Sequence, residues 1–482
     1  MFKAMSEQYQ TYLRDESRLT GQADSIIFPA NLQDLQAAVR QCLEEGAPIT
    51  VQGSRTGICG GAVPMEGRII NLSEMAAPLS LESGEDGFFY LKVQPGYLLS
   101  SLRRDLRRRR FDWLDPAQAD TAAARVFSQS AETFWPPDPS ELTASIGGIA
   151  STNARGPAAF KYGSAGQHIE ALEAIMPEGE LYTITRDRPE GMVGNIDLMQ
   201  ALLGGEGMYG IIASLTLRLL PKPSEMWGIS FFFDDENNAA YFIDQVLTLD
   251  IPALAALDFL DKESMALAVS LKEQAAKLRE IPDPPAAAAA AVYLELYAYS
   301  EEELEAAAEM LMEAAAENGS DPDDSWALSG DDIEKLRLFR HAVPEAANTR
   351  LDKLRLVLPA ATKLGGDLTL PGYSFQKALS FYRESLKEAG VKAAVFGHCG
   401  EKHLHVNLFP EDARQREAAL GLMRKWLAES RRQNGFMFRE HGIGKTKKEF
   451  FQDLEDPQAV EIKRGIKKSL DPKNLFNPGN MF

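Results

Sequence analysis

The chain has 482 residues, of which 45% are hydrophobic and 25% are charged, and these ordinary globular values exclude general disorder. Because one hydrophobic core rarely serves so long a chain, two or three domains are expected. The 51 basic and 70 acidic residues give a formal net charge of −19, which argues against a nucleic-acid partner, since phosphate backbones attract basic surfaces.

Cysteine usage and the lack of long apolar runs indicate the compartment. The three cysteines, Cys42, Cys59 and Cys399, cannot build a disulfide framework and fit a reducing environment. The first residues have no apolar signal-peptide core, and no stretch of about 18 apolar residues occurs. These features predict a soluble cytoplasmic protein without a transmembrane segment.

The first part of the chain alternates between helical and strand-like patterns. Residues 35–45 have the apolar spacing of a helix, with Asn31 as a possible cap, and residues 48–52 read as a short strand. A glycine-rich segment, 53–61, leads from there into another strand at about 68–72.

Six arginines lie within residues 103–110. They indicate either an anion-binding patch or the solvated face of a helix that begins near Leu98. The solvated helix is favoured, because the chain is acidic and has no second basic cluster.

A second glycine-rich region spans 138–163, and a third glycine cluster, 204–210, precedes an alternating strand at 211–220. The segment that starts at Pro221 is a plausible domain boundary. Strand-like and helical segments alternate beyond it and predict an antiparallel sheet with helices: 228–233, 287–299 and 301–317.

The third cluster contains Gly205-x-Gly207-x-x-Gly210, which satisfies the dinucleotide-binding pattern. That pattern requires a strand before it and a helix after it, so that the pyrophosphate meets the helix N-terminus. Here a helical segment, 198–203, precedes the glycines and a strand follows them. A Rossmann site is therefore rejected.

Two glycine-rich loops, 53–61 and 147–156, predict two close approaches of the backbone to a ligand. Glycine permits positive φ and lets amide groups converge on an anion. The first loop has glycines at four of nine consecutive positions, more than a tight surface turn needs. A phosphate-bearing ligand is therefore favoured.

Several motifs resemble those of one family. The segment GSRTGICGGAVP, which begins at Gly53, resembles the first FAD loop of the vanillyl-alcohol oxidase superfamily. The closest resemblance is to the branch with glycolate oxidase, D-lactate dehydrogenase and D-2-hydroxyglutarate dehydrogenase. Motifs similar to the second and third FAD regions and to the closing signature follow in matching order: 137–140, 146–153, 161–164, 204–212 and 466–479.

The resemblance implies an α+β fold, with a two-subdomain FAD-binding domain of the vanillyl-alcohol oxidase type and an α+β cap domain built on an antiparallel sheet. The implied boundaries are 1–222 for the FAD-binding domain, 223–427 for the cap or substrate domain, and 428–482 for a C-terminal segment that returns to the FAD-binding domain. The residues implied to bind FAD are Gly53, Ser54, Arg55, Thr56, Gly57, Gly60, Gly61, Pro137, Asp138, Ser145, Gly147, Gly148, Thr152, Asn153, Gly156, Tyr162, Gly163, Glu206, Gly207, Ile211, Ile212 and Asn477.

The mode of flavin attachment follows from the residues available. The first histidine in the chain is His168, so the first loop cannot form a histidyl–flavin bond. No cysteine lies between Cys59 and Cys399, so the second loop offers no cysteinyl bond. Non-covalent FAD is predicted, unless Cys59 is used.

Four of the six histidines lie near the C-terminal end: His398, His403, His405 and His441. Because His403 and His405 are two apart, a strand would point both to the same face. Two imidazoles and a carboxylate are standard ligands for a divalent ion, with an open position for substrate. The alternative is a pair of imidazoles hydrogen-bonded at a strand end.

The family pattern G-H-x-G-D-G-N-x-H-x-N, followed later by E-H-G, resembles segments 397–407 and 440–442. Where the family has Asp-Gly-Asn, this chain has Glu401-Lys402-His403, so His403 could substitute for a neighbouring ligand. The implied roles are a divalent metal, Zn or Mn, on His398, His405 and Glu440, the catalytic base on His441, and substrate contact on Asn407.

A substrate carboxylate needs a cation, which the bidentate fork of arginine supplies best. Arg340 lies in a segment that resembles the family's arginine motif and is the predicted carboxylate-binding residue. The 2-hydroxyglutarate enzymes carry a lysine two residues before an aspartate, and Gly365 holds that place before Asp367, with Lys363 displaced. This favours a smaller or different 2-hydroxy acid.

The resemblance implies a FAD-dependent dehydrogenase that oxidises a D-2-hydroxy acid, similar to D-lactate or glycolate, to the 2-oxo acid, with a metal assisting and flavin N5 accepting the hydride. Two alternatives are a transferase similar to alkylglycerone-phosphate synthase and a FAD-carrying partner subunit of a larger complex. The electron acceptor stays open among oxygen, a quinone, a cytochrome and an electron-transferring flavoprotein.

Overall fold

The computed structural model describes residues 1–482 except 140, 187–191, 194–195, 273–277, 357–362 and 439. Ser140, which belongs to the motif at 137–140, lies outside the described residues. The chain forms two compact units. Unit 1 comprises Met1–Gly156, Gly163–Lys222 and Glu440–Phe482, and unit 2 comprises Pro157–Tyr162 and Pro223–Arg439.

The first division falls after Lys222, where the proline-rich boundary was expected, but the second falls at residue 440 rather than 428. The chain does not divide at residue 428 because helix α12 (Ala413–Arg432) continues through that residue. The residues after it stay with unit 2: the backbone amide of Phe438 donates to the Asp367 carbonyl at 2.7 Å.

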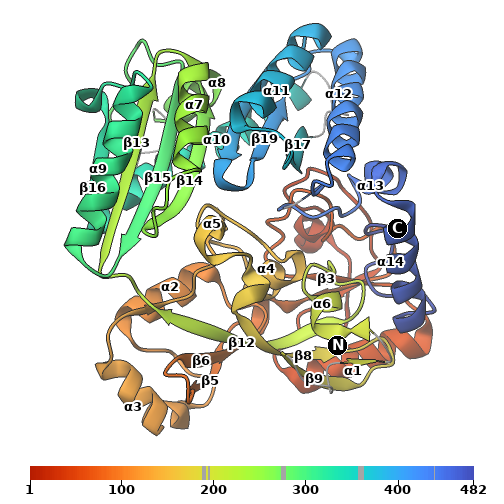
Figure 1. Ribbon diagram of the computed structural model, residues 1–482. Coiled ribbons are helices and arrows are strands. Elements are labelled where there is room, and N and C mark those ends of the chain that lie inside the picture. The colour runs from red at the N-terminus through yellow and green to blue at the C-terminus, as the bar shows by residue number, and fades with distance from the viewer. Residues whose placement is uncertain (140, 187–191, 194–195, 273–277, 357–362, 439) are drawn as a thin grey trace. The chain divides into compact units, whose positions relative to one another are not determined.

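Unit 1 contains strands β1 to β12 and seven α-helices among the described residues (Figure 1). The strands are β1 (Lys3–Ala4), β2 (Ser25–Ile27), β3 (Ile49–Gln52), β4 (Arg68–Asn71), β5 (Pro78–Ser83), β6 (Phe89–Val93), β7 (Thr133–Phe134), β8 (Ile169–Ile175), β9 (Leu181–Thr185), β10 (Met192–Val193), β11 (Ile196–Asp197) and β12 (Ile211–Pro221). The helices are α1 (Leu32–Glu45), α2 (Leu99–Arg108), α3 (Ala122–Gln129), α4 (Ile146–Thr152), α6 (Leu198–Leu202), α13 (Lys448–Leu454) and α14 (Pro457–Leu470).

Two main sheets build unit 1. One has the order β1-β2-β4-β3, in which β4 pairs in parallel with both β2 and β3. The other is antiparallel, with the order β5-β6-β12-β8-β9 and β7 attached to β12. Since α6 precedes the glycine cluster and β12 follows it, the rejection of a Rossmann site is confirmed.

Helix α1 forms because its sequence supplies both ends and an apolar face. The Asn31 side chain caps the first turn by accepting from the Asp34 amide at 2.9 Å, and Gly46, at φ 64°, ends the helix. Leu35 and Val39, one turn apart, are fully buried. Helix α2 carries the arginine-rich segment, and its arginines lie on the exposed side, as the solvated-helix interpretation predicts.

The C-terminal segment is built into unit 1 beside β3. The Ile49 amide donates to the Leu475 carbonyl at 2.7 Å, and the Asn477 amide donates to the Ile49 carbonyl at 2.8 Å. Buried Lys467 fixes the approach, because its Nζ donates to the Phe476 carbonyl at 2.8 Å and to an Asp471 carboxylate oxygen at 2.6 Å. Burial lowers the pKa of Lys467 below its ordinary value.

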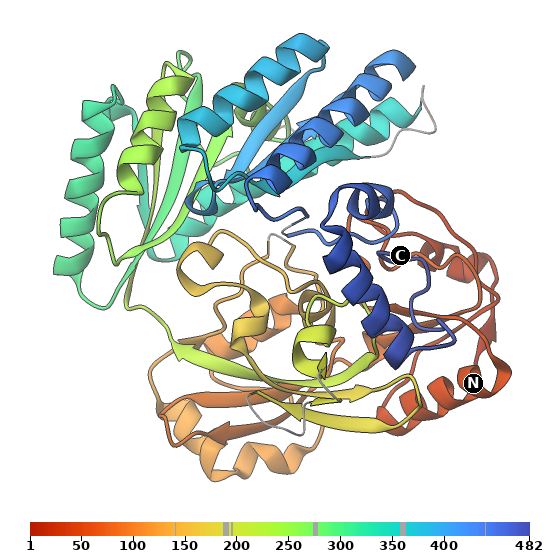
Figure 2. The same ribbon diagram turned by 45° about the vertical axis from the view of Figure 1, so that its right-hand side comes forward.

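Unit 2 is a seven-stranded antiparallel sheet with helices on both faces (Figures 1 and 2). Its strands, in the order β16-β13-β15-β14-β18-β19-β17, are β13 (Glu225–Phe233), β14 (Leu254–Asp261), β15 (Ala290–Ala298), β16 (Trp326–Ser329), β17 (Leu364–Thr369), β18 (Ala393–His398) and β19 (His403–Leu408). Its helices are α5 (Ala159–Tyr162), α7 (Glu236–Val246), α8 (Lys262–Ser270), α9 (Glu301–Glu317), α10 (Ile333–Arg355), α11 (Phe375–Ala389) and α12. The predicted antiparallel sheet with helices is confirmed.

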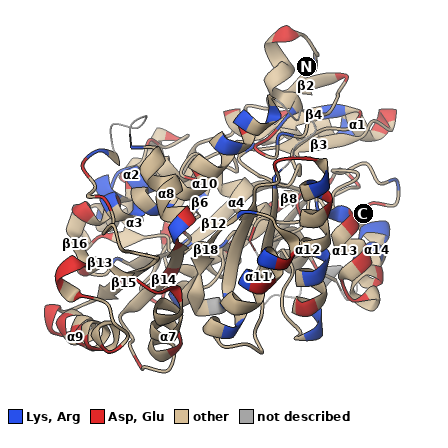
Figure 3. Cartoon of the chain, turned by 90° about the horizontal axis from the view of Figure 1, so that it is seen from above, with Lys and Arg blue, Asp and Glu red and all other residues tan. Residues whose placement is uncertain are grey.

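The two faces of this sheet are covered by different helices. An added Cβ at Gly228 would lie 2.6 Å from Ile333 of α10, and one at Gly366 would lie 3.4 Å from Trp426 of α12. Helix α9 matches the predicted helix at both ends, with Ser300 as its cap, and Figure 3 marks the glutamates along it.

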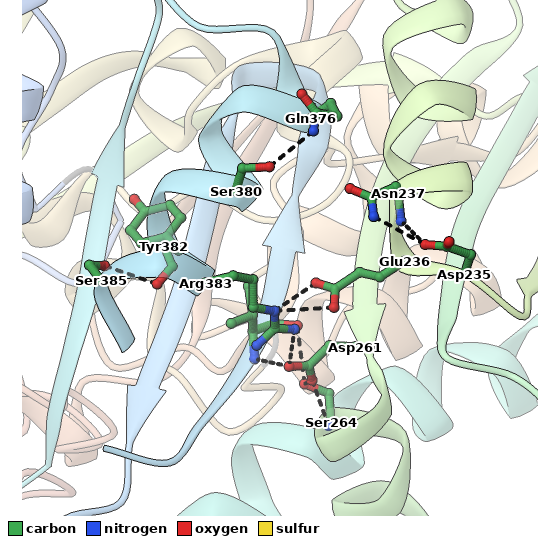
Figure 4. A network of polar contacts seen from close by, with 11 residues as sticks. Asp235, Glu236, Asn237, Asp261, Ser264, Gln376, Ser380, Tyr382, Arg383 and Ser385 are labelled. Carbon is green, nitrogen blue, oxygen red and sulfur yellow. Dashed lines mark hydrogen bonds and ion pairs between the residues drawn. The ribbon is translucent and has the colours of Figure 1, made fainter. Parts of the chain in front are cut away.

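A partly buried ionic cluster links helices α11, α7 and α8 to the end of strand β14 (Figure 4). From α11, Arg383 Nη2 donates to Asp261 Oδ2 at 2.7 Å and Arg383 Nε donates to Glu236 of α7 at 2.8 Å. Asp261 also caps α8 by accepting from the Ser264 amide at 2.8 Å. The histidines and carboxylates of the candidate site lie on the opposite face of the sheet.

No helix among the described residues is long and apolar enough to cross a membrane.

Candidate functional site

A row of histidines and carboxylates crosses four adjacent strands of unit 2. Pairing in the sheet sets Asp258 of β14 opposite His398 of β18, His398 opposite His403 of β19, and Asp367 of β17 opposite His405 of β19. Because opposite residues of antiparallel strands point to the same face, these five side chains share one face. The prediction that His403 and His405 point to the same face of a strand is confirmed.

Every member of the row is buried: Asp258 is 1% exposed, His398 5%, His403 0%, His405 6% and Asp367 2%. Burying so many polar groups is costly unless each has a polar partner. The partners therefore define what the row can do.

Asp258 holds His398 and is itself held by Arg340. His398 Nδ1 lies 2.7 Å from Asp258 Oδ1, and Arg340 of α10 forms an ion pair with Asp258 through Nε. Burial by itself raises the pKa of Asp258, but the Arg340 guanidinium and His398 outweigh it and hold the pKa below its ordinary value. An imidazole that donates from Nδ1 to a carboxylate presents the Nε2 lone pair, the arrangement of many metal-binding histidines.

A second carboxylate–imidazole pair lies on the next strands. His403 Nε2 is 2.6 Å from Asp367 Oδ1, and the rings of His403 and His405 have centroids 4.7 Å apart. One ligand atom from each of Asp367, His403 and His405 lies within 4.8 Å of the other two. Two imidazoles and one carboxylate suit several divalent ions.

The predicted catalytic and metal-binding residues are divided between the units. His398 and His405, with ring centroids 5.5 Å apart, belong to unit 2 together with Arg340 and Asn407. Glu440 and His441 belong to unit 1. Arg340, predicted to bind a substrate carboxylate, is 8% exposed and is engaged with Asp258.

Asn407 lies on the same strand and face as His405 and directly opposite Gly365. An added Cβ at Gly365 would lie 2.7 Å from the Val406 carbonyl and 3.3 Å from Asn407 Oδ1. The position where the resemblance implies a lysine in the 2-hydroxyglutarate enzymes therefore has little room here for a larger residue. Lys363 Nζ donates to Asn348 Oδ1 at 3.1 Å instead.

In unit 1, the predicted first and second FAD loops approach each other closely. An added Cβ at Gly53 would lie 2.2 Å from Ser145 Oγ, so a larger residue there would displace the Ser145 side chain. Ser145 in turn caps α4, because its Oγ accepts from the Gly148 amide at 3.3 Å.

The predicted third FAD loop meets the C-terminal segment. Asn477 Nδ2 donates to the Glu206 carbonyl at 2.7 Å, and Asn477 Oδ1 accepts from the Val51 amide at 2.7 Å. An added Cβ at Gly207 would lie 2.5 Å from Asn477 Nδ2, and one at Gly61 would lie 3.8 Å from Glu206 Oε2. Segments from four parts of the chain therefore converge in unit 1.

The first loop has the donors that a phosphate-bearing cofactor requires. In the described part of the chain, the backbone amides of residues 54–58 donate no hydrogen bond to another protein group. Arg55 adopts φ 61° and packs its guanidinium 4.3 Å from the centre of the Tyr12 ring. A loop with consecutive amides open to a ligand fits the pyrophosphate of FAD.

The remaining predicted FAD residues fall into two groups. Asp138 forms an ion pair with Arg103, and Asn153 accepts from the Gly166 amide at 2.8 Å, both within unit 1. Tyr162 belongs to unit 2, where its ring lies 6.3 Å from that of Tyr297. The others lie in unit 1: Ser54, Thr56, Gly57, Gly60, Pro137, Gly147, Thr152, Gly156, Gly163, Ile211 and Ile212.

Sequence reasoning missed Asp258 as a member of the row. The available signal is an acidic residue in the middle of an otherwise apolar strand, LAALDFLD, where burial demands a partner. Asp367 was noted only as a motif position, because its pairing with His403 depends on the order of β17 and β19 in the sheet.

Comparison with known proteins identifies the family. The family model described as FAD linked oxidases, C-terminal domain, matches residues 222–481, and the one described as FAD binding domain matches 23–124 and 123–185. The chain belongs to the FAD-linked oxidase family. The resemblance to the hydroxyacid branch and the expectation of FAD as the cofactor are therefore confirmed.

Individual relatives of this FAD-linked oxidase agree with that assignment. A D-lactate dehydrogenase from Anaerostipes hadrus is 27% identical over 98% of this chain and 92% of its own length. A D-2-hydroxyglutarate dehydrogenase from Xanthomonas citri pv. viticola is 26% identical over 95% of this chain and 89% of its own. The structure of 4-ethylphenol oxidase from Gulosibacter chungangensis matches 99% of this chain and 93% of its own with a TM-score of 0.70 at 17% identity. The predicted α+β fold of the vanillyl-alcohol oxidase type is confirmed.

Proposed function

We propose that this FAD-linked oxidase oxidises a small D-2-hydroxy acid, similar to D-lactate or glycolate, to the 2-oxo acid. The observation that carries the proposal is the buried row on β14, β18, β19 and β17, because imidazoles oriented by carboxylates are the donor set that binds a divalent ion beside a substrate oxygen. The relatives named for D-lactate and D-2-hydroxyglutarate support the substrate class.

The size of the substrate is inferred from the surroundings of Asn407. Gly365 faces Asn407, and an added Cβ at Gly365 would lie 2.7 Å from the Val406 carbonyl oxygen. Gly365 itself supplies no cation to a second substrate carboxylate. Lys363, which lines the pocket beside Asn407, donates to Asn348. A monocarboxylic 2-hydroxy acid is therefore preferred to 2-hydroxyglutarate.

Each residue has a proposed task. The glycine-rich loops would hold FAD, which would supply a hydride acceptor at N5, and His398, His405 and Glu440 would hold a divalent ion (Zn or Mn), which would supply polarisation of the α-hydroxyl. His441 takes the hydroxyl proton, a step that contributes about 10²–10⁴-fold in comparable enzymes. Arg340 orients the substrate carboxylate, Asn407 contacts the substrate, and Asp258 orients the His398 imidazole.

The decisive experiment follows the flavin spectrum under anaerobic conditions. D-Lactate, glycolate and D-2-hydroxyglutarate are added separately to the FAD-loaded protein, with dithionite as a control for reducible flavin. We expect bleaching by a monocarboxylic acid. Bleaching by dithionite alone would contradict the proposal and favour the transferase or the partner-subunit alternative.

We also propose that FAD is held without a covalent bond. Cys59, the cysteine of the first loop, is 3% exposed, so its thiol is shielded from solvent. Acid precipitation should release the yellow colour into the supernatant, and absorbance at the flavin maximum measures it. Colour that stays in the pellet would show a covalent link.

A further inference from the structure

Glu206 connects two distant segments of unit 1. Its Oε1 accepts a hydrogen bond from the Ile443 amide at 2.7 Å, and its Oε2 accepts one from the Gly444 amide at 2.7 Å. These amides belong to the turn that directly follows Glu440 and His441 in the chain. One carboxylate therefore holds the turn next to the proposed base.

The backbone of Glu206 is itself firmly held. It adopts φ 50°, a left-handed conformation that is unfavourable for a residue with a side chain. Its carbonyl accepts from Asn477 Nδ2 at 2.7 Å and from Asn480 Nδ2 at 3.1 Å, and its amide donates to the Ser151 carbonyl at 2.8 Å. A strained conformation persists only where its surroundings determine it, so the carboxylate projects from a fixed point.

The turn is equally confined from its own side. Gly442 has φ 73°, and an added Cβ there would lie 2.8 Å from Glu206 Oε1. An added Cβ at Gly444 would lie 2.1 Å from the Cys59 carbonyl, which also accepts from the Lys445 amide at 2.9 Å. The turn is thus packed between Glu206 and the first glycine-rich loop.

The groups around Glu206 partly oppose the cost of burying its carboxylate. Burial raises the pKa of Glu206 above its ordinary value, and the two amides and the Lys445 ammonium act in the opposite direction without outweighing it. Two amide donors on one carboxylate are charge-assisted hydrogen bonds, about twice as strong as neutral ones.

We propose that Glu206 is a positioning residue for the oxidation: it fixes the turn at residues 442–444 and thereby the direction of the His441 side chain. The role lies beyond the cofactor contact that the motif resemblance implies for Glu206. It rests on the proposed function, because it takes His441 as the base.

The test compares Glu206→Gln with the wild-type protein, both full-length and loaded with FAD. Glutamine keeps the shape of the side chain but offers a single acceptor, so one of the two amides meets an NH₂ group. We expect faster hydrogen–deuterium exchange in the peptide covering residues 442–446, a fall in kcat of about tenfold or more, and a KM within about threefold of wild type. Dithionite should reduce the variant's flavin normally.

The matched control is Glu173→Gln. Glu173 is a partly buried carboxylate of β8 that accepts from Ser214 Oγ at 2.6 Å and lies outside the proposed machinery. Glu173→Gln should leave kcat and the hydrogen–deuterium exchange of residues 442–446 unchanged. A fall in kcat of similar size in this control would show a general loss of stability and overturn the proposal.

A second variant keeps the test decisive if Glu206→Gln does not fold. Gly442→Ala places a methyl group against the Glu206 carboxylate. Its control is Gly46→Ala, which adds a methyl group at a similar φ of 64° with no atom within 4 Å. We expect kcat to fall in Gly442→Ala and not in Gly46→Ala. Equal kcat in wild type, Glu206→Gln and Gly442→Ala would refute the positioning role and leave the proposed function standing. If no 2-hydroxy acid reduced the flavin of the wild-type protein, the proposed function would be refuted as well.

Discussion

Two buried carboxylates, Glu206 in unit 1 and Asp258 in unit 2, are held in different ways. In unit 1, Glu206 is bound by the backbone amides of Ile443 and Gly444. In unit 2, Asp258 is bound by the side chains of Arg340 and His398. Backbone donors depend on the path of the chain, whereas side-chain partners depend on residue identity. The turn held by Glu206 should therefore be sensitive to backbone changes, and the cluster around Asp258 to the loss of single side chains.

The largest effect should come from His441→Ala, which removes the proposed base from the backbone-held turn. We expect flavin reduction by the hydroxy acid to fall about 10²–10⁴-fold, with FAD and metal retained. Glu440→Ala, at the neighbouring position, should lose the metal instead. Stopped-flow absorbance and elemental analysis measure the two outcomes. If His441→Ala loses metal as readily, His441 is a ligand, and His403 is the first candidate for the base.

The next effect concerns the side-chain pairs of unit 2. His398→Ala and His405→Ala should lose the metal, and Asp258→Asn should weaken metal affinity about 10–100-fold, because the ring of His398 is no longer oriented. Asp258→Asn should also cost about 3–5 kcal/mol of stability, since it leaves Arg340 buried without its anion.

A matched control for Asp258 is Asp244→Asn. Asp244 also lies in unit 2, where it accepts from the amides of Phe375 and Gln376 at the start of α11. Asp244→Asn should lower the melting temperature slightly and leave the metal content unchanged. Full metal content in His398→Ala, measured by mass spectrometry, would contradict the ligand assignment.

A smaller effect is expected from Arg340→Lys. Lysine keeps a positive charge near Asp258 but lacks the planar fork, so the substrate carboxylate is aimed less well. KM should rise and kcat should fall, together by about tenfold in kcat/KM. Arg337→Lys, one turn earlier on α10, is the control, because Arg337 binds Glu295 through Nε at 2.9 Å. Unchanged kinetics in Arg340→Lys would leave Arg340 with a structural task only.

The smallest effect is a pH dependence in unit 1. Burial lowers the pKa of Lys445 to about 8 from an ordinary value of 10.5. Above pH 8 Lys445 has lost its proton in the folded protein but keeps it in the unfolded chain. The contribution of Lys445 to the free energy of unfolding therefore rises with pH up to about 10.5. Between pH 7 and 9 the gain should be about 1 kcal/mol in the wild type relative to Lys445→Met, measured by urea unfolding. If the difference in unfolding free energy between wild type and Lys445→Met stayed constant from pH 7 to 9, the lowered pKa of Lys445 would be contradicted.

Local patterns predicted many of the elements. The helix capped by Asn31, the helix at 301–317 and the strand after the third glycine cluster follow from period and capping, which neighbouring residues determine. The expected boundary at 428 does not coincide with the division between the compact units at residue 440, for a related reason. A helix that continues to Arg432 shows no break in composition where the domain was expected to end.

The sequence by itself determined the family, the glycine loops and the identity of the histidines, because motif residues and their spacing are written along the chain. Only the tertiary structure decided that Asp258 orients His398, that Asp367 pairs with His403, and that Glu206 holds the turn after His441. These contacts join residues separated by 140, 36 and 237 positions. Strand order and the return of the C-terminal segment bring such residues together, and both result from packing the whole chain around its cores rather than from any local pattern.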